Sequence, residues 1–106
     1  MAHNIPHLTD ENFQQAVSKG LTLVDFYATW CGPCRMMAPN FEKSAASFPL
    51  KALFAKVNTE NEQNLGARFG IRGIPTIIIF KDSKEVYRTS GALDEVNINK
   101  LVAQFI

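Results

Sequence analysis

The chain has 106 residues, of which 46% are hydrophobic and 20% are charged, and its formal net charge at pH 7 is +1. These proportions predict a single folded domain over residues 1–106 and exclude a disordered chain. Lysines and arginines form no cluster, so no nucleic-acid partner is expected. No segment approaches the ~20 apolar residues of a membrane span, and the N-terminus lacks the pattern of a secretory signal. We therefore expect a cytoplasmic protein that does not contact a membrane.

The first two thirds of the chain alternate between strand and helix patterns. Residues 4–8 predict a short strand, which Pro6 restricts to a sheet edge. Apolar runs at 21–28 (LTLVDFYA) and 52–57 (ALFAKV) are typical of strands covered on both faces. The expected helices are 10–18, capped by Thr9 or Asp10 and ended by Gly20, then 33–48, and 60–69 ended by Gly70.

The last third predicts a hairpin and a helix. Residues 76–80 and 85–89 flank a tight turn at 81–84, and an amphipathic helix capped by Asp94 follows at 93–105. Strand–helix–strand alternation favours parallel pairing with helices on both faces, and the hairpin adds antiparallel strands. The sequence therefore predicts an α/β fold, a three-layer α/β/α sandwich with a mixed five-stranded sheet flanked by four helices. A purely parallel, flavodoxin-like sheet is the alternative, but the hairpin leaves no room for its crossover helix.

The two cysteines, Cys31 and Cys34, lie between a central strand and a helix. A disulfide between them closes too short a loop to add much stability, so their role is chemical. Unpaired N–H groups and the macrodipole at a helix N-terminus stabilise an anion, which lowers the pKa of the Cys31 thiol. Cys34 lies one turn further on and is expected to be less exposed. We expect one sulfur to attack a disulfide and the other to resolve the adduct.

The segment Trp30-Cys31-Gly32-Pro33-Cys34, which follows an apolar strand and precedes Pro39, resembles the thioredoxin family. The resemblance continues through residues 69–76 and Gly91-Ala92, and the order of elements agrees over essentially the whole chain. It implies the thioredoxin fold and a general protein disulfide reductase that acts by reversible oxidation of Cys31 and Cys34. Its electron donor would be thioredoxin reductase, which uses NADPH and a flavin, and its substrates would be disulfide-containing proteins. The resemblance further implies a monomer without a bound cofactor.

The resemblance also implies a substrate-binding surface around Cys31. Ile74–Pro75 would be a cis peptide bond in a loop that faces the cysteines and pairs with an extended substrate segment through its backbone. Small residues would let the substrate backbone approach closely. With Pro75, the residues expected to contact the substrate are Trp30, Gly32, Pro33, Ile74, Gly91 and Ala92.

Asp25 and Lys56 are the only charged residues within their two apolar strands. Burial of an unpaired carboxylate is costly and raises its pKa. The family resemblance implies that Asp25 lies behind Cys34 and takes up its proton through a water molecule. It also makes the strand of Lys56 a neighbour of that of Asp25, so Lys56 is expected to tune the pKa of Asp25. From the residues alone, either charge could instead reach solvent at a strand end.

Three features depart from the family pattern. Tyr27 stands where Trp is frequent, and its hydroxyl changes the polarity near the site. The hairpin turn Asp82-Ser83 lacks the usual Asn-Gly, so a looser turn or another turn type is expected. Asn58 replaces a common Asp, without a catalytic consequence.

Three other functions are compatible with parts of the sequence. A disulfide oxidase or isomerase would share the fold and the two cysteines, but Gly32-Pro33 between them is typical of reductants. A non-catalytic binding module would use the apolar surface and would not need the cysteines. A zinc site formed by His3, His7, Cys31 and Cys34 is disfavoured, because this order of ligands inverts that of zinc fingers.

Overall fold

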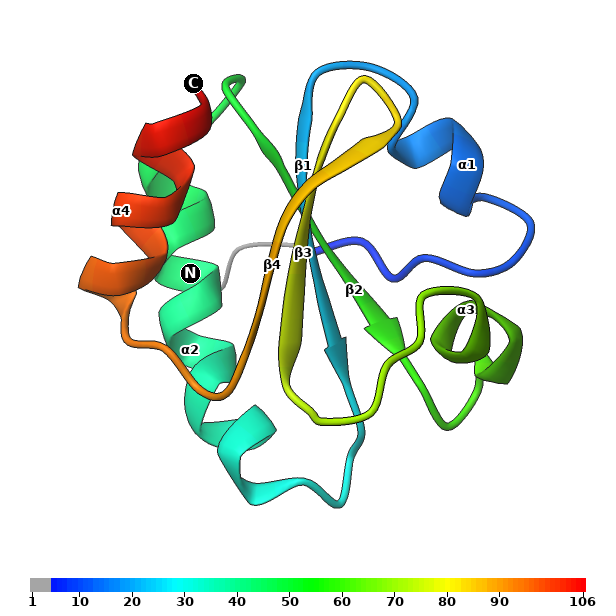
Figure 1. Cartoon of the computed structure of the whole chain (residues 1–106). Coiled ribbons are helices and arrows are strands. Elements are labelled where there is room, and N and C mark those ends of the chain that lie inside the picture. The colour runs from blue at the N-terminus through cyan, green and yellow to red at the C-terminus, as the bar shows by residue number, and fades with distance from the viewer. Residues whose placement is uncertain (1–4) are drawn as a thin grey trace.

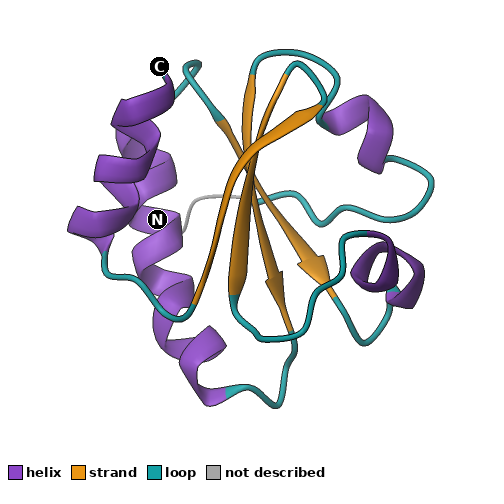
Figure 2. Cartoon of the chain, viewed as in Figure 1, coloured by secondary structure: helices purple, strands orange, loops and turns teal. Residues whose placement is uncertain are grey.

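Within residues 5–106, which are the residues it describes, the computed structural model contains a four-stranded sheet and four helices (Figure 1). Helices α2 and α4 cover one face of the sheet, and α1 and α3 cover the other (Figure 2). This arrangement confirms the predicted three-layer α/β/α sandwich. The elements are α1 (Phe13–Ala16), β1 (Leu21–Tyr27), α2 (Gly32–Ser47), β2 (Leu53–Asn58), α3 (Gln63–Arg68), β3 (Thr76–Lys81), β4 (Lys84–Ser90) and α4 (Glu95–Phe105).

The strand order is β2-β1-β3-β4, with β1 parallel to β2 and antiparallel to β3, and β3 antiparallel to β4. The mixed pairing is as predicted and excludes the purely parallel alternative. β1 is central because its side chains are apolar on both faces, and residues 21–26 are all buried. Its register places Asp25 opposite Lys56 of β2 on one side and Ile77 of β3 on the other.

Successive side chains of β1 point to opposite faces of the sheet and so contribute to two separate hydrophobic cores. Val24 and Phe26 point toward α1 and α3, whereas Leu21 and Leu23 point toward α2 and α4. Each side is completed by side chains from the neighbouring strands and the covering helices. The first core also contains Phe13, Val17, Ala55, Val57, Leu65, Ile78 and Phe80, and the second contains Met37, Phe41, Ala45, Phe54, Ile77, Ile79, Ile98 and Val102.

The predicted fifth strand at 4–8 is wrong. Asn4 lies outside the described residues, and the rest of the segment makes a single parallel bridge, His7 to Lys56. Two backbone bonds support it, from Leu8 N–H to Lys56 O (2.7 Å) and from Lys56 N–H to Pro6 O (2.9 Å). Proline has no N–H, so the ladder cannot continue through residue 6.

Two helices are shorter than predicted, each for a local reason. At α1, Asn12 Oδ1 accepts a hydrogen bond from Thr9 N–H (2.8 Å), so residues 9–12 form a turn and neither Thr9 nor Asp10 caps the helix. At α3, Asn58 Oδ1 accepts from Glu60 N–H (2.9 Å), which keeps residues 58–62 out of the helix. The other helices lie close to the predicted bounds, and Asp94 caps α4 as expected by accepting from Asn97 N–H (2.9 Å).

The β3–β4 turn is tight and not loose. Asp82 and Ser83 both have positive φ, 48° and 68°, which is the conformation that Asn-Gly adopts in a two-residue hairpin turn. The loop before β1 holds it there: Asp82 Oδ1 accepts from Gly20 N–H (2.8 Å), and Ser83 N–H donates to Val17 O (2.8 Å). Hydrogen bonds to the preceding loop thus stabilise the positive-φ conformation for which such turns usually have a glycine.

No helix within residues 5–106 is long and apolar enough to cross a membrane.

Candidate active site

Cys31 and Cys34 form a disulfide at the N-terminus of α2, directly after β1. Their Cα atoms are 5.2 Å apart, within the usual range for disulfides. Cys31 is the N-cap residue of α2, and Pro33 occupies the first turn, where its fixed φ favours a helix and its missing N–H costs nothing. The predicted position of Cys31 at the helix N-terminus is confirmed.

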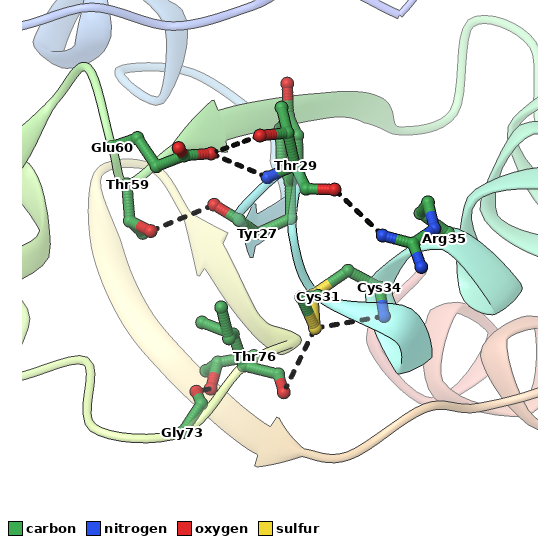
Figure 3. The surroundings of a disulfide bond; sticks show 10 residues. Tyr27, Thr29, Cys31, Cys34, Arg35, Thr59, Glu60, Gly73 and Thr76 are labelled. Carbon is green, nitrogen blue, oxygen red and sulfur yellow. Dashed lines mark hydrogen bonds between the residues drawn. A yellow bond between two sulfur atoms is a disulfide. The ribbon is translucent and has the colours of Figure 1, made fainter.

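Cys31 Sγ lies among backbone polar groups. The Cys34 N–H donates a hydrogen bond to it (3.2 Å) (Figure 3). The Ile74 carbonyl oxygen lies 3.8 Å away. In the disulfide form the exposed fractions of Cys31 and Cys34 are 4% and 3%. The expected difference in exposure is therefore absent: both cysteines belong to one small buried cluster, against which Tyr27 and Ile74 pack.

The loop before β3 approaches the cysteines as predicted, and Ile74–Pro75 is a cis peptide bond. Pro75 is buried, and its carbonyl accepts a hydrogen bond from Gly91 N–H (2.9 Å), which brings residue 91 to the same edge of the sheet. Thr76 was not predicted as a site residue; its Oγ1 donates to Gly73 O (2.6 Å) and lies 3.0 Å from Ser90 Oγ. These contacts attach the loop to both of its flanking segments.

An exposed surface borders the disulfide. The Trp30 side chain is 70% exposed, so it does not pack in a core. Trp30 and Ile74 line a hollow of about 340 Å³, together with Arg72 and residues from α3. Pro33, Gly91 and Ala92 are exposed, and Gly32 is half-buried.

Asp25 is buried, with 1% of its surface exposed, and its Oδ1 has no hydrogen-bond partner in the part of the chain that the structure describes. Burial raises the pKa of this carboxyl from 3.8 to about 7, and the positive charge of Lys56 partly opposes the increase. The structure thus rejects the alternative that Asp25 is a strand-end charge in solvent. Lys56 occupies the paired position on β2, as expected.

A cavity of about 240 Å³ lies between the buried acid and Cys34. Its lining includes Asp25, Cys34, Lys56 and Tyr27, so Asp25 does lie behind Cys34. A space of this volume can hold several water molecules, and the lining supplies polar partners for them. The arrangement permits proton exchange between Cys34 and Asp25 without direct contact.

Tyr27 connects this cavity to the surface. Its hydroxyl is hydrogen-bonded to His7 Nε2 (2.9 Å), and Lys56 Nζ lies 5.4 Å from the centre of its ring. Burial, and then the charges of Asp25 and Glu60, raise the pKa of Tyr27.

Of the histidines considered for zinc, His3 lies outside the described residues, and residues 5–106 contain no group of three or more potential metal ligands.

Three polar residues, Thr29, Glu60 and Arg35, were not predicted from the sequence as part of the site. Glu60 Oε1 accepts hydrogen bonds from Thr29 N–H (2.7 Å) and Thr29 Oγ1 (2.6 Å), and Arg35 Nη1 donates to Thr29 O (3.0 Å) (Figure 3). Residues 29 and 60 are 31 positions apart, so no local pattern could have connected them.

Comparison with known proteins agrees with this geometry. The family model for thioredoxin matches residues 4–104. The chain is 39% identical over 97 residues to thioredoxin of Chlamydia muridarum, covering 92% of this chain and 94% of that protein. It is 42% identical over 100 residues to thioredoxin of Chlorobaculum thiosulfatiphilum (92% and 93% covered), and 36% over 102 residues to thioredoxin of Staphylococcus saprophyticus (96% and 98% covered). With its disulfide at the start of a helix beside the Ile74–Pro75 loop, the chain belongs to the thioredoxin family.

Proposed function

We propose that this protein disulfide reductase works with Cys31 as the attacking thiol and Cys34 as the resolving thiol. The observation that carries this assignment is the N-cap position of Cys31, where the Cys34 N–H already points at its sulfur (3.2 Å). The same N–H and the helix dipole would stabilise a Cys31 thiolate. Cys34 lies within the first turn and faces the cavity behind the disulfide, so it is suited to the second step.

The proposed reaction has two exchange steps. The Cys31 thiolate attacks one sulfur of a target disulfide, forms a mixed disulfide and releases the first target thiolate. The Cys34 thiolate then attacks Cys31 Sγ, which breaks the mixed disulfide, releases the second target thiolate and closes the Cys31–Cys34 disulfide. Two electrons pass to the target, and the two protons lost by the cysteines end on its two thiols.

Asp25 is proposed as the acceptor of the Cys34 proton, through water in the shared cavity. A carboxyl with a pKa of about 7 can accept and return a proton near neutral pH, which a carboxyl at its ordinary pKa of 3.8 could not do as well. Lys56 would keep this pKa from rising further, because its charge favours the ionised form.

The target is proposed to lie as an extended segment on the surface next to Cys31. The backbone of the Ile74–Pro75 loop would pair with it, since Ile74 O lies 3.8 Å from Cys31 Sγ. Recognition through backbone groups accepts many side chains, as a general reductant requires. The further contacts would come from Trp30, Gly32, Pro33, Gly91 and Ala92.

Regeneration needs an electron donor, which we propose is a thioredoxin reductase that uses NADPH and a flavin. We also propose a monomer of one domain over residues 1–106 that acts in the cytoplasm, where thiols are kept reduced. The reductant-type pair Gly32-Pro33 supports this direction of electron flow over that of an oxidase or isomerase.

A trapping experiment tests the order of the cysteines. In Cys34→Ser, a disulfide-containing protein substrate should accumulate as a stable adduct on Cys31, detected by non-reducing electrophoresis and peptide mass analysis. Cys31→Ser is the matched control and should form no comparable adduct. An adduct on Cys34 in that control, in place of one on Cys31, would reverse the assignment. If both single variants lost disulfide reduction but still performed the protein's function in the cell, the protein would act as a binding module instead.

A further inference from the structure

The loop that leads into Cys31 is held on two sides by charged side chains. Glu60 Oε1 accepts from both Thr29 N–H (2.7 Å) and Thr29 Oγ1 (2.6 Å), and Arg35 Nη1 donates to Thr29 O (3.0 Å) (Figure 3). Every polar group of Thr29 is thus engaged, although the residue is exposed. We refer to Glu60, Thr29 and Arg35 as the Thr29 clamp.

The clamp brackets the two cysteines along the chain. Thr29 lies two residues before Cys31, and Arg35 directly follows Cys34. The Arg35–Thr29 bond therefore joins the segment before the first cysteine to the turn that contains the second. The Cys31–Cys34 disulfide makes a covalent connection across the same short stretch.

Glu60 is itself firmly placed. Its N–H donates to Asn58 Oδ1 (2.9 Å), and the adjacent Thr59 donates to Tyr27 O from both its N–H (2.8 Å) and its Oγ1 (3.0 Å). The hydrogen bonds from Thr29 also lower the pKa of Glu60 below 4.5, so the carboxylate is ionised at neutral pH. The end of β1 and the start of the catalytic loop are thus attached to the segment after β2.

We propose that Glu60 and Arg35 are positioning residues that keep the two thiols close together after the disulfide has been reduced. Reduction removes the covalent connection between Cys31 and Cys34, and the thiols then depend on the backbone for their mutual distance. A clamp that limits backbone motion raises the effective concentration of each thiol at the other. It therefore favours closure of the disulfide and makes the dithiol a stronger reductant. This inference rests on the proposed roles of the two cysteines.

The test measures the equilibrium of each protein with glutathione. In this reaction the dithiol and one glutathione disulfide give the protein disulfide and two glutathione thiols, with two electrons and two protons transferred. In Glu60→Ala, which loses two hydrogen bonds, and in Arg35→Met, which loses one, we expect the equilibrium constant for protein oxidation to fall about threefold, an effect at the low end of what one hydrogen bond contributes. This measurement determines only the fraction of each protein that is oxidised, so it is independent of the trapping experiment with Cys34→Ser.

Charge effects alone predict a different pattern. Loss of the Glu60 carboxylate would stabilise a nearby thiolate and lower the equilibrium constant, whereas loss of the Arg35 guanidinium would destabilise the thiolate and raise it. The clamp instead predicts a fall in both variants. Glu60→Gln separates the two causes further, because it removes the charge but keeps an oxygen that can accept both bonds from Thr29. The clamp predicts that Glu60→Gln stays near the wild type.

Thr29 supplies a second, independent pair of variants. Thr29→Ser keeps the hydroxyl and should match the wild type, while Thr29→Val has the same shape without the hydroxyl and should shift in the direction of Glu60→Ala. This pair decides the question should Glu60→Ala or Arg35→Met fail to fold, which thermal unfolding would reveal. Because Thr29 is exposed, both Thr29 variants should fold.

Any one of three results would overturn the clamp. The equilibrium constant for oxidation rises or does not change in Arg35→Met, or it falls in Glu60→Gln as much as in Glu60→Ala. The third result is that Thr29→Ser and Thr29→Val have equal constants. Such a result would leave the proposed function intact if the wild type still formed the Cys31–Cys34 couple and reduced protein disulfides. Failure of the wild type to do so would instead contradict the proposed function itself.

Discussion

Asp25 of β1 and Lys56 of β2 occupy directly paired positions on adjacent parallel strands, yet within residues 5–106 the two form no ion pair. The carboxyl is buried, its Oδ1 accepts no hydrogen bond among those residues, and it faces a cavity that both residues line with Cys34. Desolvation therefore outweighs the attraction of the lysine, and the pKa of Asp25 rises to about 7. The fold thus places a destabilising buried acid beside Cys34.

The first prediction is that Asp25 destabilises the oxidised protein at neutral and alkaline pH. The folded chain keeps the Asp25 proton up to about pH 7, whereas the unfolded chain loses it near pH 3.8. Between these values the folded state binds more protons, so the free energy of unfolding decreases as pH rises and reaches its lower level above pH 7. A pKa change from 3.8 to about 7 corresponds to about 4 kcal/mol.

Asp25→Asn should remove this pH dependence. Urea unfolding should give similar stabilities for the two oxidised proteins near pH 4, and the variant should be more stable by on the order of 2–4 kcal/mol at pH 8. Asp94→Asn changes an exposed acid in the same way and is the matched control. Parallel stability curves for wild type and Asp25→Asn would show that the carboxyl is not perturbed in solution.

The second prediction concerns Trp30, the only tryptophan, which is 70% exposed beside the disulfide. If it contacts protein substrates, Trp30→Ala should raise KM for a protein disulfide about tenfold, as for the loss of an aromatic contact at an interface. The rate with a small disulfide such as hydroxyethyl disulfide should change much less, because that molecule does not reach the indole. Val96→Ala, at a 60% exposed position on α4, should leave both rates unchanged. Equal losses with both substrates would mean that Trp30 supports the cysteines and not the contact.

The third prediction concerns the start of α4, where Asp94 Oδ1 accepts from the Asn97 N–H (2.9 Å) and from Asn97 Nδ2 (2.9 Å). Asp94→Ala leaves that backbone N–H without its partner and should lower the free energy of unfolding by about 1 kcal/mol. Asp94→Asn keeps an accepting oxygen and should stay close to the wild type. Urea unfolding at pH 7 measures both, and equal losses in the two variants would point to charge and not to capping.

The fourth prediction compares two apolar residues on the same helix. Ile98 is fully buried against the second core, whereas Val96 is 60% exposed. Ile98→Ala should cost about 2–5 kcal/mol through lost burial and the cavity left behind. Val96→Ala should change stability by less than about 0.5 kcal/mol. Similar costs for the two variants would mean that α4 packs on the sheet through a different face.

Local patterns in the sequence were sufficient for the alternation of strands and helices, the mixed sheet and the Cys31 position at a helix start. Each of these depends on neighbours in the chain: the period of apolar residues, a proline in a first turn, two cysteines three positions apart. Positions that break an apolar strand, such as Asp25 and Lys56, also stand out locally. The resemblance to a known family supplied the remaining expectations, namely the Ile74–Pro75 loop and the pairing of Asp25 with Lys56.

Only the tertiary structure decided the contacts between distant segments. Glu60 reaches Thr29 across 31 positions, and Gly20 holds Asp82 in a positive-φ turn that its own residues do not favour. Pro6 ends the first pairing at a single bridge, because a ladder needs an N–H at each step. Such features depend on which side chains meet when the loops dock, and a hydrogen bond between remote residues has no periodicity to reveal it. The sequence alone therefore determines the layers and the reactive pair, while the docking of the loops determines how that pair is held.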